Sequence, residues 1–251
     1  MNFQSQLQRP IPKQAVKVYQ IGQVATSKAI IFDSGALISF SINGLTDMIK
    51  DLKGIFRGKF LITSDVKKEV IDTPLKMKNY ELEALKIKQL LDEGVLEMPS
   101  SLEIGDSEIS EKARKILDIA NTSFTGNGRE LHLLDIGEAS SLALSKILTE
   151  KEIKNLLAID ERTTRMIVEK HEKLKDFLEK KLHVRITINH QNLKFFEGFK
   201  IIRSTELAYV AYKKGLVTIK DKEVLDALLY ALKFKGAAIS VEEIEEMKRM
   251  G

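Results

Sequence analysis

The sequence predicts an α/β fold, in which a central and mostly parallel sheet lies between two layers of helices. Short apolar runs alternate along the chain with longer amphipathic segments. The runs are continuously apolar rather than alternating, which is typical of parallel strands that are covered on both faces. Two of the runs end in an aspartate, and in a parallel sheet such ends lie together at the edge where ligands bind.

Six segments are expected as strands because apolar and β-branched residues are grouped in them between turn signals. In chain order they are KAIIFD (28–33), KFLITS (59–64), VLEMPSS (95–101), NLLAID (155–160), the alternating VRITINH (184–190) and FKIIRS (199–204). Helical periodicity or capping residues predict the intervening helices. These are expected at 36–56, 65–72, 75–94, 106–119, 135–152, 162–182, 205–216, 220–236 and 240–250, with Ser64 or Asp65 capping the second and a loop at 121–130.

Composition limits the class of protein. The chain has 251 residues, 43% of them hydrophobic, which suits one large domain or one ordinary domain with additions. It contains no cysteine, which excludes disulfides, cysteine-ligated zinc, iron–sulfur clusters and thiol nucleophiles. The net charge of +4 (40 minus 36) permits a nucleic-acid partner without requiring one. Because no secretory signal or transmembrane segment is recognisable, we expect a cytoplasmic protein without a membrane partner.

The expected organisation has three parts. Residues 1–27 form a polar N-terminal extension with a short strand at VKVYQI, residues 28–238 form the main domain, and residues 239–251 form a C-terminal helix. Within the main domain, residues 166–198 are an additional segment. It is rich in lysines that could contact phosphates, namely Lys170, Lys173, Lys175, Lys180 and Lys181. The simpler interpretation is a solvated helix, because glutamates are interleaved with them.

Acidic residues gather where the predicted strands end. Asp33 and Asp160 end two apolar strands, Glu69 lies on the helix after the second strand, and Asp135 and Glu138 share one helix face at spacing i, i+3. Grouped carboxylates repel one another unless a divalent cation lies among them, and oxygen ligands suit Mg²⁺ or Mn²⁺. Such a site suits hydrolysis of phosphodiesters. Helix capping by Asp33, Asp135 or Asp160 and a solvated helix face at Glu69 are the alternatives.

Five motifs at these positions resemble the PIN-domain nucleases. They are IIFDSGALI, SDVKKEV, LDIGEASSLALSK, LLAIDERTTR and STELAYVAYKKGLV. The third is the most specific, since it is similar to the GEA-type third motif of prokaryotic, largely archaeal, members. The resemblance covers roughly residues 28–165 and 199–236. It implies a three-layer α/β/α fold and Mg²⁺- or Mn²⁺-dependent cleavage of single-stranded or structured RNA.

The resemblance also implies roles for individual residues. The catalytic, metal-binding acids are then Asp33, Glu69, Glu138 and Asp160. Asp135 becomes an auxiliary acid at the metal or the helix cap. Three further residues support the site: Ser34 through its hydroxyl, Glu161 as an alternate ligand, and Arg165 by orienting a carboxylate or meeting phosphate.

Three functions stay open from the sequence. The first is a metal-dependent endoribonuclease, which all four acids favour. The second is a non-catalytic module of the same fold that binds RNA or a protein. The third is the toxin of a toxin–antitoxin pair, which the added segments disfavour. A homodimer stays open as well. None of the four histidines, His132, His171, His183 and His190, is assigned to catalysis.

Overall fold

The computed structural model describes residues 28–250. The expected extension at 1–27, with its short strand, lies outside the described residues. Within the described part, no helix combines the length and apolar character needed to cross a membrane.

The central sheet has four parallel strands in the order β2-β1-β5-β7. The strands are β1 (Lys28–Phe32), β2 (Lys59–Leu61), β5 (Lys154–Ala158) and β7 (Ile201–Ile202). Phe32 of β1 is in register with Ala158 of β5, which in turn is in register with Ile202 of β7. The predicted α/β fold with a parallel sheet is therefore confirmed.

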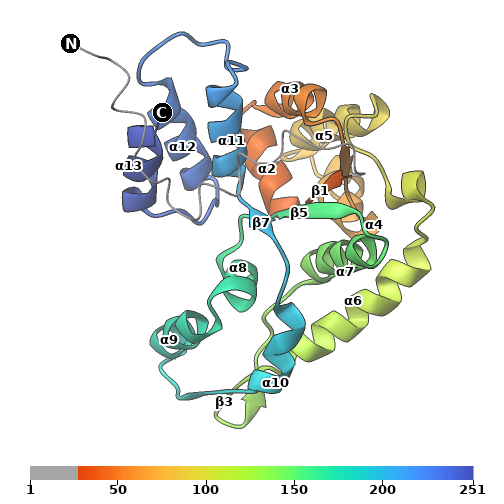
Figure 1. Ribbon diagram of the computed structural model, residues 1–251, viewed down its shortest axis with the longest axis vertical. Coiled ribbons are helices and arrows are strands. Elements are labelled where there is room, and N and C mark those ends of the chain that lie inside the picture. Colours follow the sequence, from red (N-terminus) through yellow and green to blue (C-terminus); the bar gives the residue numbers. More distant parts are fainter. Residues whose placement is uncertain (1–27, 251) are drawn as a thin grey trace.

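Two layers of helices cover the sheet because side chains along β1 alternate between its faces. Ile30 and Phe32 belong to a core shared with α2 (Ser34–Ile42), α3 (Thr46–Phe56) and α11 (Ser204–Lys213). Ala29 and Ile31 belong to a second core shared with α6 (Asp106–Asn121) and α7 (Ile136–Glu150). In Figure 1 the first group lies above the strands and the second below them. The result is a three-layer α/β/α arrangement.

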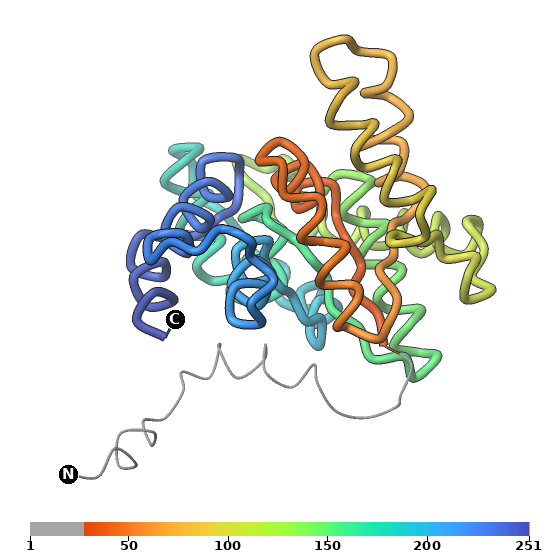
Figure 2. Tube along the Cα trace, turned by 90° about the horizontal axis from the view of Figure 1, so that it is seen from above, coloured from red at the N-terminus to blue at the C-terminus, as the bar shows by residue number. Residues whose placement is uncertain are grey.

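A helical hairpin follows β2 and stands out from the rest of the molecule (Figure 2, orange to yellow). It consists of α4 (Ser64–Lys67), the π-helical turn η2 (Lys68–Asp72), the 3₁₀ turn η3 (Pro74–Lys76) and α5 (Glu81–Asp92). The cap of α4 is Thr63, whose side-chain oxygen accepts from the Val66 N–H at 3.3 Å, and the expected caps Ser64 and Asp65 are wrong. A π-turn often marks a functional site, and η2 carries Glu69.

A second, antiparallel sheet lies at the lower end of the molecule in Figure 1, and it corrects one expectation. Its strands are β4 (Arg129–Glu130), β3 (Phe124–Gly126) and β6 (Ile186–Ile188), in that order. The segment 121–130 was expected as a loop, but β3 and β4 form a hairpin. Its turn, Asn127-Gly128, has positive φ at both residues, which is the conformation that an Asn-Gly pair favours. The additional segment thus contributes one strand, β6, to a sheet whose other two strands lie outside it.

Other expected elements also differ from the structure, and the helix expected at 75–94 is divided into η3 and α5. The helix at 162–182 is two helices, α8 (Arg162–Glu169) and α9 (His171–Leu182), separated at Lys170, whose φ of −152° and ψ of 58° are not helical. No Gly or Pro marks this break in the sequence. The break lets both helices bury apolar residues in one core. The strand at 95–101 is reduced to one bridge, Leu61 to Glu97. The helix at 36–56 is interrupted at Gly44, whose φ is +68°.

The remaining elements complete the layers. They are η4 (Pro99–Leu102), α10 (His190–Leu193), η5 (Lys194–Phe196), α12 (Val224–Phe234) and α13 (Val241–Met250). Among them, α12 and α13 pack beside α11, and Tyr209, Leu229 and Ile244 belong to their shared small core. The α13 helix agrees with the helix expected at the C-terminus.

We predict that Leu142→Ala destabilises the protein by about 2–5 kcal/mol, because Leu142 of α7 is completely buried beneath the sheet and its loss leaves a cavity. Leu82→Ala is the matched control, since Leu82 is 60% exposed and its truncation should change stability by less than about 0.5 kcal/mol. Urea unfolding of both variants measures the difference. Equal effects would mean that α7 does not form the core described here.

Candidate active site

The strand order creates a switch point between β1 and β5. From β1 the chain moves to β2 on one side, and then returns to β5 on the other side of β1. In open parallel sheets, ligands bind outside the carboxyl ends of the strands at such a point. Asp33 directly follows β1, and its N–H donates to the carbonyl of Ala158 at 3.1 Å. Asp160 follows the end of β5, so both acids lie at the switch point.

Asp33 is a buried carboxylate with one oxygen left over. It is 2% exposed and caps α2, where Oδ2 accepts from the Gly35 N–H at 3.3 Å. Oδ1 is buried and has no hydrogen-bond partner among the described residues. Burial raises the pKa of Asp33 to about 7, and the charges of Glu69 and Asp160 add to this rise, while backbone donors oppose it.

Asp160 has the same arrangement on the neighbouring strand. It is also 2% exposed, and its Oδ1 accepts from the Ser204 N–H, at the start of α11, at 2.8 Å. Oδ2 is buried without a partner in the described part of the chain. Burial raises the pKa of Asp160, and this rise is opposed by the hydroxyl and N–H of Ser204, by the hydroxyl of Ser39 and by the charge of Arg165. Gly35 lies between the two acids, since a Cβ there would be 3.6 Å from Asp33 Oδ2 and 3.9 Å from Asp160 Cβ.

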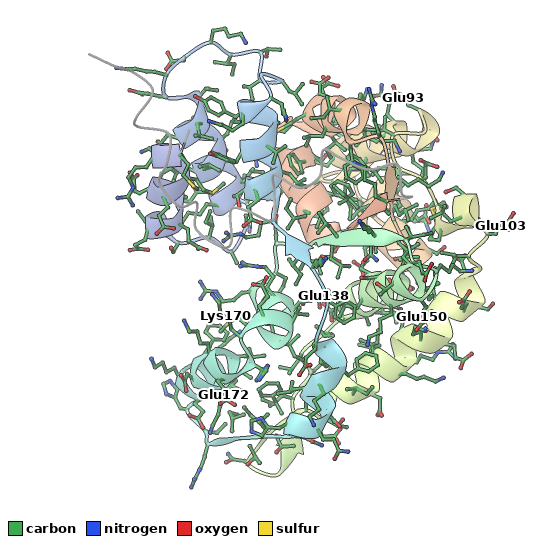
Figure 3. The ribbon with its side chains drawn as sticks, in the orientation of Figure 1. Glu93, Glu103, Glu138, Glu150, Lys170 and Glu172 are labelled. Carbon is green, nitrogen blue, oxygen red and sulfur yellow. The ribbon has the colours of Figure 1, made fainter. Side chains whose placement is uncertain are left out.

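Glu138 of α7 lies close to this pair and connects α7 to α8 through a hydrogen bond. It is 8% exposed and lies near the centre of the molecule, whereas Glu93, Glu103 and Glu172 lie at its periphery (Figure 3). Its Oε2 accepts from the Asp135 N–H at 2.8 Å, and its Oε1 accepts from the Thr164 hydroxyl. Burial raises the pKa of Glu138 to about 8, and the charges of Asp33 and Glu161 add to it.

Glu69 reaches the site from the π-turn. Its carboxylate lies against the first turn of α7, so closely that a Cβ on Gly137 would be 2.6 Å from Oε1 and 2.7 Å from Oε2. The Ser34 side chain and the Gly137 N–H donate to it. Burial raises the pKa of Glu69, as do the charges of Asp135 and Asp65. Glycine at 137 is therefore what allows Glu69 to approach α7.

Asp135 and Glu161 lie farther out, on the wall of a pocket of about 350 Å³ that Glu138 also lines. Asp135 caps α7, but its side chain is 79% exposed and lies 3.2 Å from His132 Nε2. Glu161 caps α8 by accepting from the Thr164 N–H at 2.7 Å. Lys181 of α9 lines the same pocket and is a cation of the additional segment at the site.

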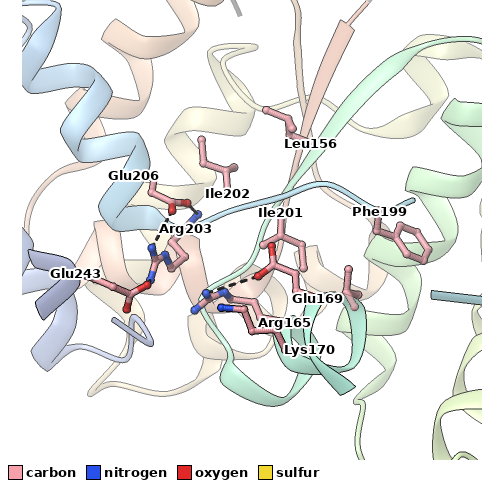
Figure 4. A pocket seen from close by; sticks show the side chains of 11 residues that line it. Leu156, Arg165, Glu169, Lys170, Phe199, Ile201, Ile202, Arg203, Glu206 and Glu243 are labelled. Atoms are coloured by element: carbon pink, nitrogen blue, oxygen red, sulfur yellow. Dashed lines mark hydrogen bonds and ion pairs between the residues drawn. The ribbon is translucent and has the colours of Figure 1, made fainter. Parts of the chain in front are cut away.

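Arg165 lies on the other side of Asp160, in a pocket of about 320 Å³ beside the edge strand β7 (Figure 4). Its Nη1 donates to the carbonyl of Ala238 at 2.6 Å. Arg203 donates to the same carbonyl at 3.3 Å, and pairs with Glu206 at 2.8 Å and Glu243 at 2.9 Å. The Ala238 N–H in turn donates to the Asp160 carbonyl at 3.1 Å. The two arginines thus fix the backbone that holds Asp160.

Sequence reasoning missed several of these groups. The Thr164 hydroxyl donates to Glu138, and Arg203 holds the Ala238 backbone that donates to Asp160. Asp65, like Asp135, is a negative charge close enough to raise the pKa of Glu69. Thr164 lies inside the fourth motif, and Arg203 lies near the end of the predicted strand 199–204, so position could have indicated both. Nothing local indicates that Arg203 shares an acceptor with Arg165, because Ala238 is far from both in the sequence.

The donor set at the switch point fits a divalent cation in part. The two orphaned oxygens, Asp33 Oδ1 and Asp160 Oδ2, are hard ligands of the kind that Mg²⁺ and Mn²⁺ prefer. The described residues contain no group of three or more His, Cys, Asp or Glu side chains arranged to hold a metal ion. The geometry therefore brings Asp33 and Asp160 together, with Glu69 and Glu138 held beside them by other partners.

Comparisons with known proteins identify no relative of this chain. No family model matches the chain, and searches of the curated proteins and of the solved structures find no match.

We predict that Asp33→Asn stabilises the metal-free protein at pH 8. The pKa of Asp33 rises from 3.8 unfolded to about 7 folded, so stability is greatest in acid and falls as pH rises between these values. Removing the charge should raise the free energy of unfolding by on the order of a few kcal/mol above pH 7, and should leave it unchanged below pH 4. Thermal unfolding in EDTA across this range measures the effect.

Asp51→Asn is the matched control, because Asp51 is an exposed helix residue and its neutralisation should leave stability nearly unchanged at every pH. A destabilised Asp33→Asn protein at pH 8 would contradict the burial of an unpaired charge at this position.

Proposed function

We propose that this protein is a Mg²⁺- or Mn²⁺-dependent endoribonuclease that hydrolyses RNA phosphodiesters. The observation that carries the proposal is the pair of buried, unpartnered carboxylate oxygens on Asp33 and Asp160 at the switch point of a parallel sheet. A charged carboxylate with one buried, unpartnered oxygen is unfavourable unless it takes up a proton or a cation compensates its charge. The resemblance of five sequence motifs to the PIN-domain nucleases supports the same chemistry.

In this proposal, Asp33 and Asp160 hold the cation, with Glu69 or Glu138 completing its ligands. When bound, the cation supplies Lewis-acid activation of water and of the scissile phosphate. The Ser34 side chain orients Glu69, and the Thr164 hydroxyl orients Glu138. Where Glu69 is the third ligand, Glu138 does not bind the cation, and its pKa of about 8 lets its carboxyl group hold or release a proton near neutral pH.

The substrate class follows from the cations near the acids. Lys181 lines the pocket that Asp135, Glu138 and Glu161 also line, where it can contact a phosphate of the bound strand. The net charge of +4 is compatible with a polyanionic substrate such as RNA. Because α9 carries other exposed lysines on the same segment, a strand leaving the pocket can continue along it.

A second candidate is a non-catalytic module that binds RNA or a protein. It is favoured by the lack of a ready three-ligand group among the described acids. A module of this kind would bind RNA in a salt-dependent manner without cutting it. The toxin role has no comparable observation in its favour.

We predict metal-dependent cleavage that Asp33→Asn abolishes. Labelled single-stranded RNA, structured RNA and single-stranded DNA are incubated with Mg²⁺, Mn²⁺ or EDTA, and products are resolved on gels. Loss of one metal-binding carboxylate should lower the cleavage rate by at least about 100-fold, since a cation can no longer be held at the switch point. Asp51→Asn should cut as fast as the parent.

Cleavage by Asp33→Asn at the parental rate would refute the assignment of Asp33. No cleavage of any substrate by the parent, together with salt-sensitive RNA binding, would favour the non-catalytic module.

We predict that Gly137→Ala lowers cleavage without lowering stability. The new methyl group would overlap the Glu69 carboxylate, which is the end of a flexible side chain and can move aside. A displaced Glu69 should reduce the rate by about 10- to 100-fold, whereas alanine within a helix is intrinsically favourable. The rate and the melting temperature are measured together.

Glu69→Ala provides the control background, in which Gly137→Ala should have no further effect on the rate. If the two substitutions lower the rate independently, Gly137 acts by some route other than the position of Glu69.

A further inference from the structure

The pocket of about 350 Å³ beside the acids has walls that a bound cation would not use. Glu138 and Glu161 line one part of it, and α9 supplies Lys181 and Leu182. A further wall is the segment 131–135, which leads into α7. The volume is at the lower end of the range of small-ligand sites, so the pocket has room for one nucleotide.

His132 presents an aromatic ring to this pocket. Its Nε2 lies 3.2 Å from Asp135 Oδ1, and its Nδ1 lies 3.4 Å from Asn121 Nδ2. Asn121 is itself fixed, because its Oδ1 accepts from the Leu133 N–H at 3.0 Å. Both contacts of His132 engage the ring nitrogens, and the side chain is still 70% exposed. The imidazole is therefore held at its edges while at least one face stays accessible.

An exposed leucine belongs to the same lining. Leu182 ends α9 and is 42% exposed, although Leu178 one turn earlier is buried. Leu131 adds a partly buried apolar side chain that packs against the core. A flat, apolar group that entered the pocket would remove this surface from water, which is favourable.

The charges of the lining favour a base over a phosphate inside the pocket. Asp135, Glu138 and Glu161 are carboxylates and would repel a phosphate there, whereas a nucleobase is uncharged. Lys181 is the only lysine or arginine among the described residues of the lining. It has no acidic partner in the described part of the chain, and its nearest recorded contact is the Phe177 ring at 5.8 Å. A strand can therefore place a phosphate at Lys181 and turn its base inward.

We propose that this pocket binds an unpaired base of the RNA strand, stacked on the imidazole of His132 and packed against Leu182. The base site rests on the proposed nuclease function, since it makes a single strand or an unpaired loop the substrate of the acids. A base inside the pocket cannot pair with a second strand, so a duplex is excluded. Single-stranded RNA is commonly bound by stacking of its bases on aromatic side chains, histidine among them.

Fluorescence anisotropy in EDTA tests the base site without cleavage. A short labelled RNA that lacks secondary structure is titrated with the full chain, and the same strand annealed to its complement is the paired form. Low ionic strength keeps the contact between Lys181 and phosphate measurable. We expect the single strand to bind at least about tenfold more tightly than the duplex, because only an unpaired base can be stacked in the pocket.

Substitutions of His132 separate stacking from a structural role. His132→Ala should raise the Kd for the single strand about 5- to 150-fold, the effect of losing one stacked base. His132→Phe keeps a ring and should stay within about threefold of the parent, which would not hold if His132 only anchored Asp135. In a cleavage assay with Mn²⁺, His132→Ala should raise the KM and leave kcat nearly unchanged, as loss of uniform binding does.

Leu182 and two exposed residues outside the pocket complete the set of variants. Leu182→Ala should raise the same Kd about two- to fivefold, since less apolar surface is covered. His190→Ala is the matched control for the histidine, because His190 is also exposed and lies 3.7 Å from a carboxylate, that of Glu172. Leu85→Ala is the control for the leucine, since Leu85 is exposed on α5. Both controls should bind both RNAs as the parent does.

The base site is overturned if the parent binds the duplex as tightly as the single strand, or binds neither. It is also overturned if His132→Ala binds like the parent, or if His132→Phe loses as much affinity as His132→Ala. Failure of the nuclease function gives a different result. Binding that depends on His132, without cleavage in Mg²⁺ or Mn²⁺, contradicts the nuclease and supports the base site. Cleavage with an unchanged KM in His132→Ala contradicts the base site and supports the nuclease.

Discussion

The burial of two carboxylates at the ends of neighbouring strands is the constraint on which the site depends. Asp33 and Asp160 are nearly inaccessible to water, and each keeps one oxygen without a protein partner. Burying an uncompensated charge is unfavourable, which is why the pKa of Asp33 rises to about 7. The fold accommodates this because the start of α11 donates to one acid and the start of α2 to the other. The two buried carboxylates thereby lower the stability of the protein, and a cation bound between them would restore it.

Several small or distant residues support this pair. Gly35 lies in contact with both acids, and Gly137 leaves space for the Glu69 carboxylate beside α7. On the far side, Arg165 and Arg203 share the Ala238 carbonyl, and the Ala238 N–H holds the Asp160 backbone. Two arginines near each other repel, and the pKa of Arg165 is lowered by burial and by Arg203. Glu206 and Glu243 balance this charge at Arg203, which keeps the support in place without a ligand.

The sequence was sufficient for the parts of the fold that rest on local pattern. Continuous apolar runs such as KAIIF and NLLA mark the strands, and the register of β1 with β5 brings their final acids together. The sequence was insufficient where tertiary packing decides. The break at Lys170 has no Gly or Pro, and the small antiparallel sheet joins segments about 60 residues apart. The turn Asn127-Gly128 did carry a readable hairpin signal. At the site, the four acids could be chosen from strand ends and helix spacing, but hydrogen bonds such as that from Thr164 to Glu138 depend on packing.

Whether Asp33 and Asp160 hold a divalent cation is tested most directly by calorimetric titration of Mn²⁺ into the protein at pH 6.5, in buffers with different ionisation enthalpies. If Asp33 and Asp160 hold the cation, binding must displace protons, because the pKa values of Asp33 and Glu138 lie at about 7 and about 8. We expect release of roughly one proton or more per cation, affinity that rises with pH, and loss of binding in Asp160→Asn. Binding without proton release that survives in Asp160→Asn, or no binding at all, would contradict this assignment.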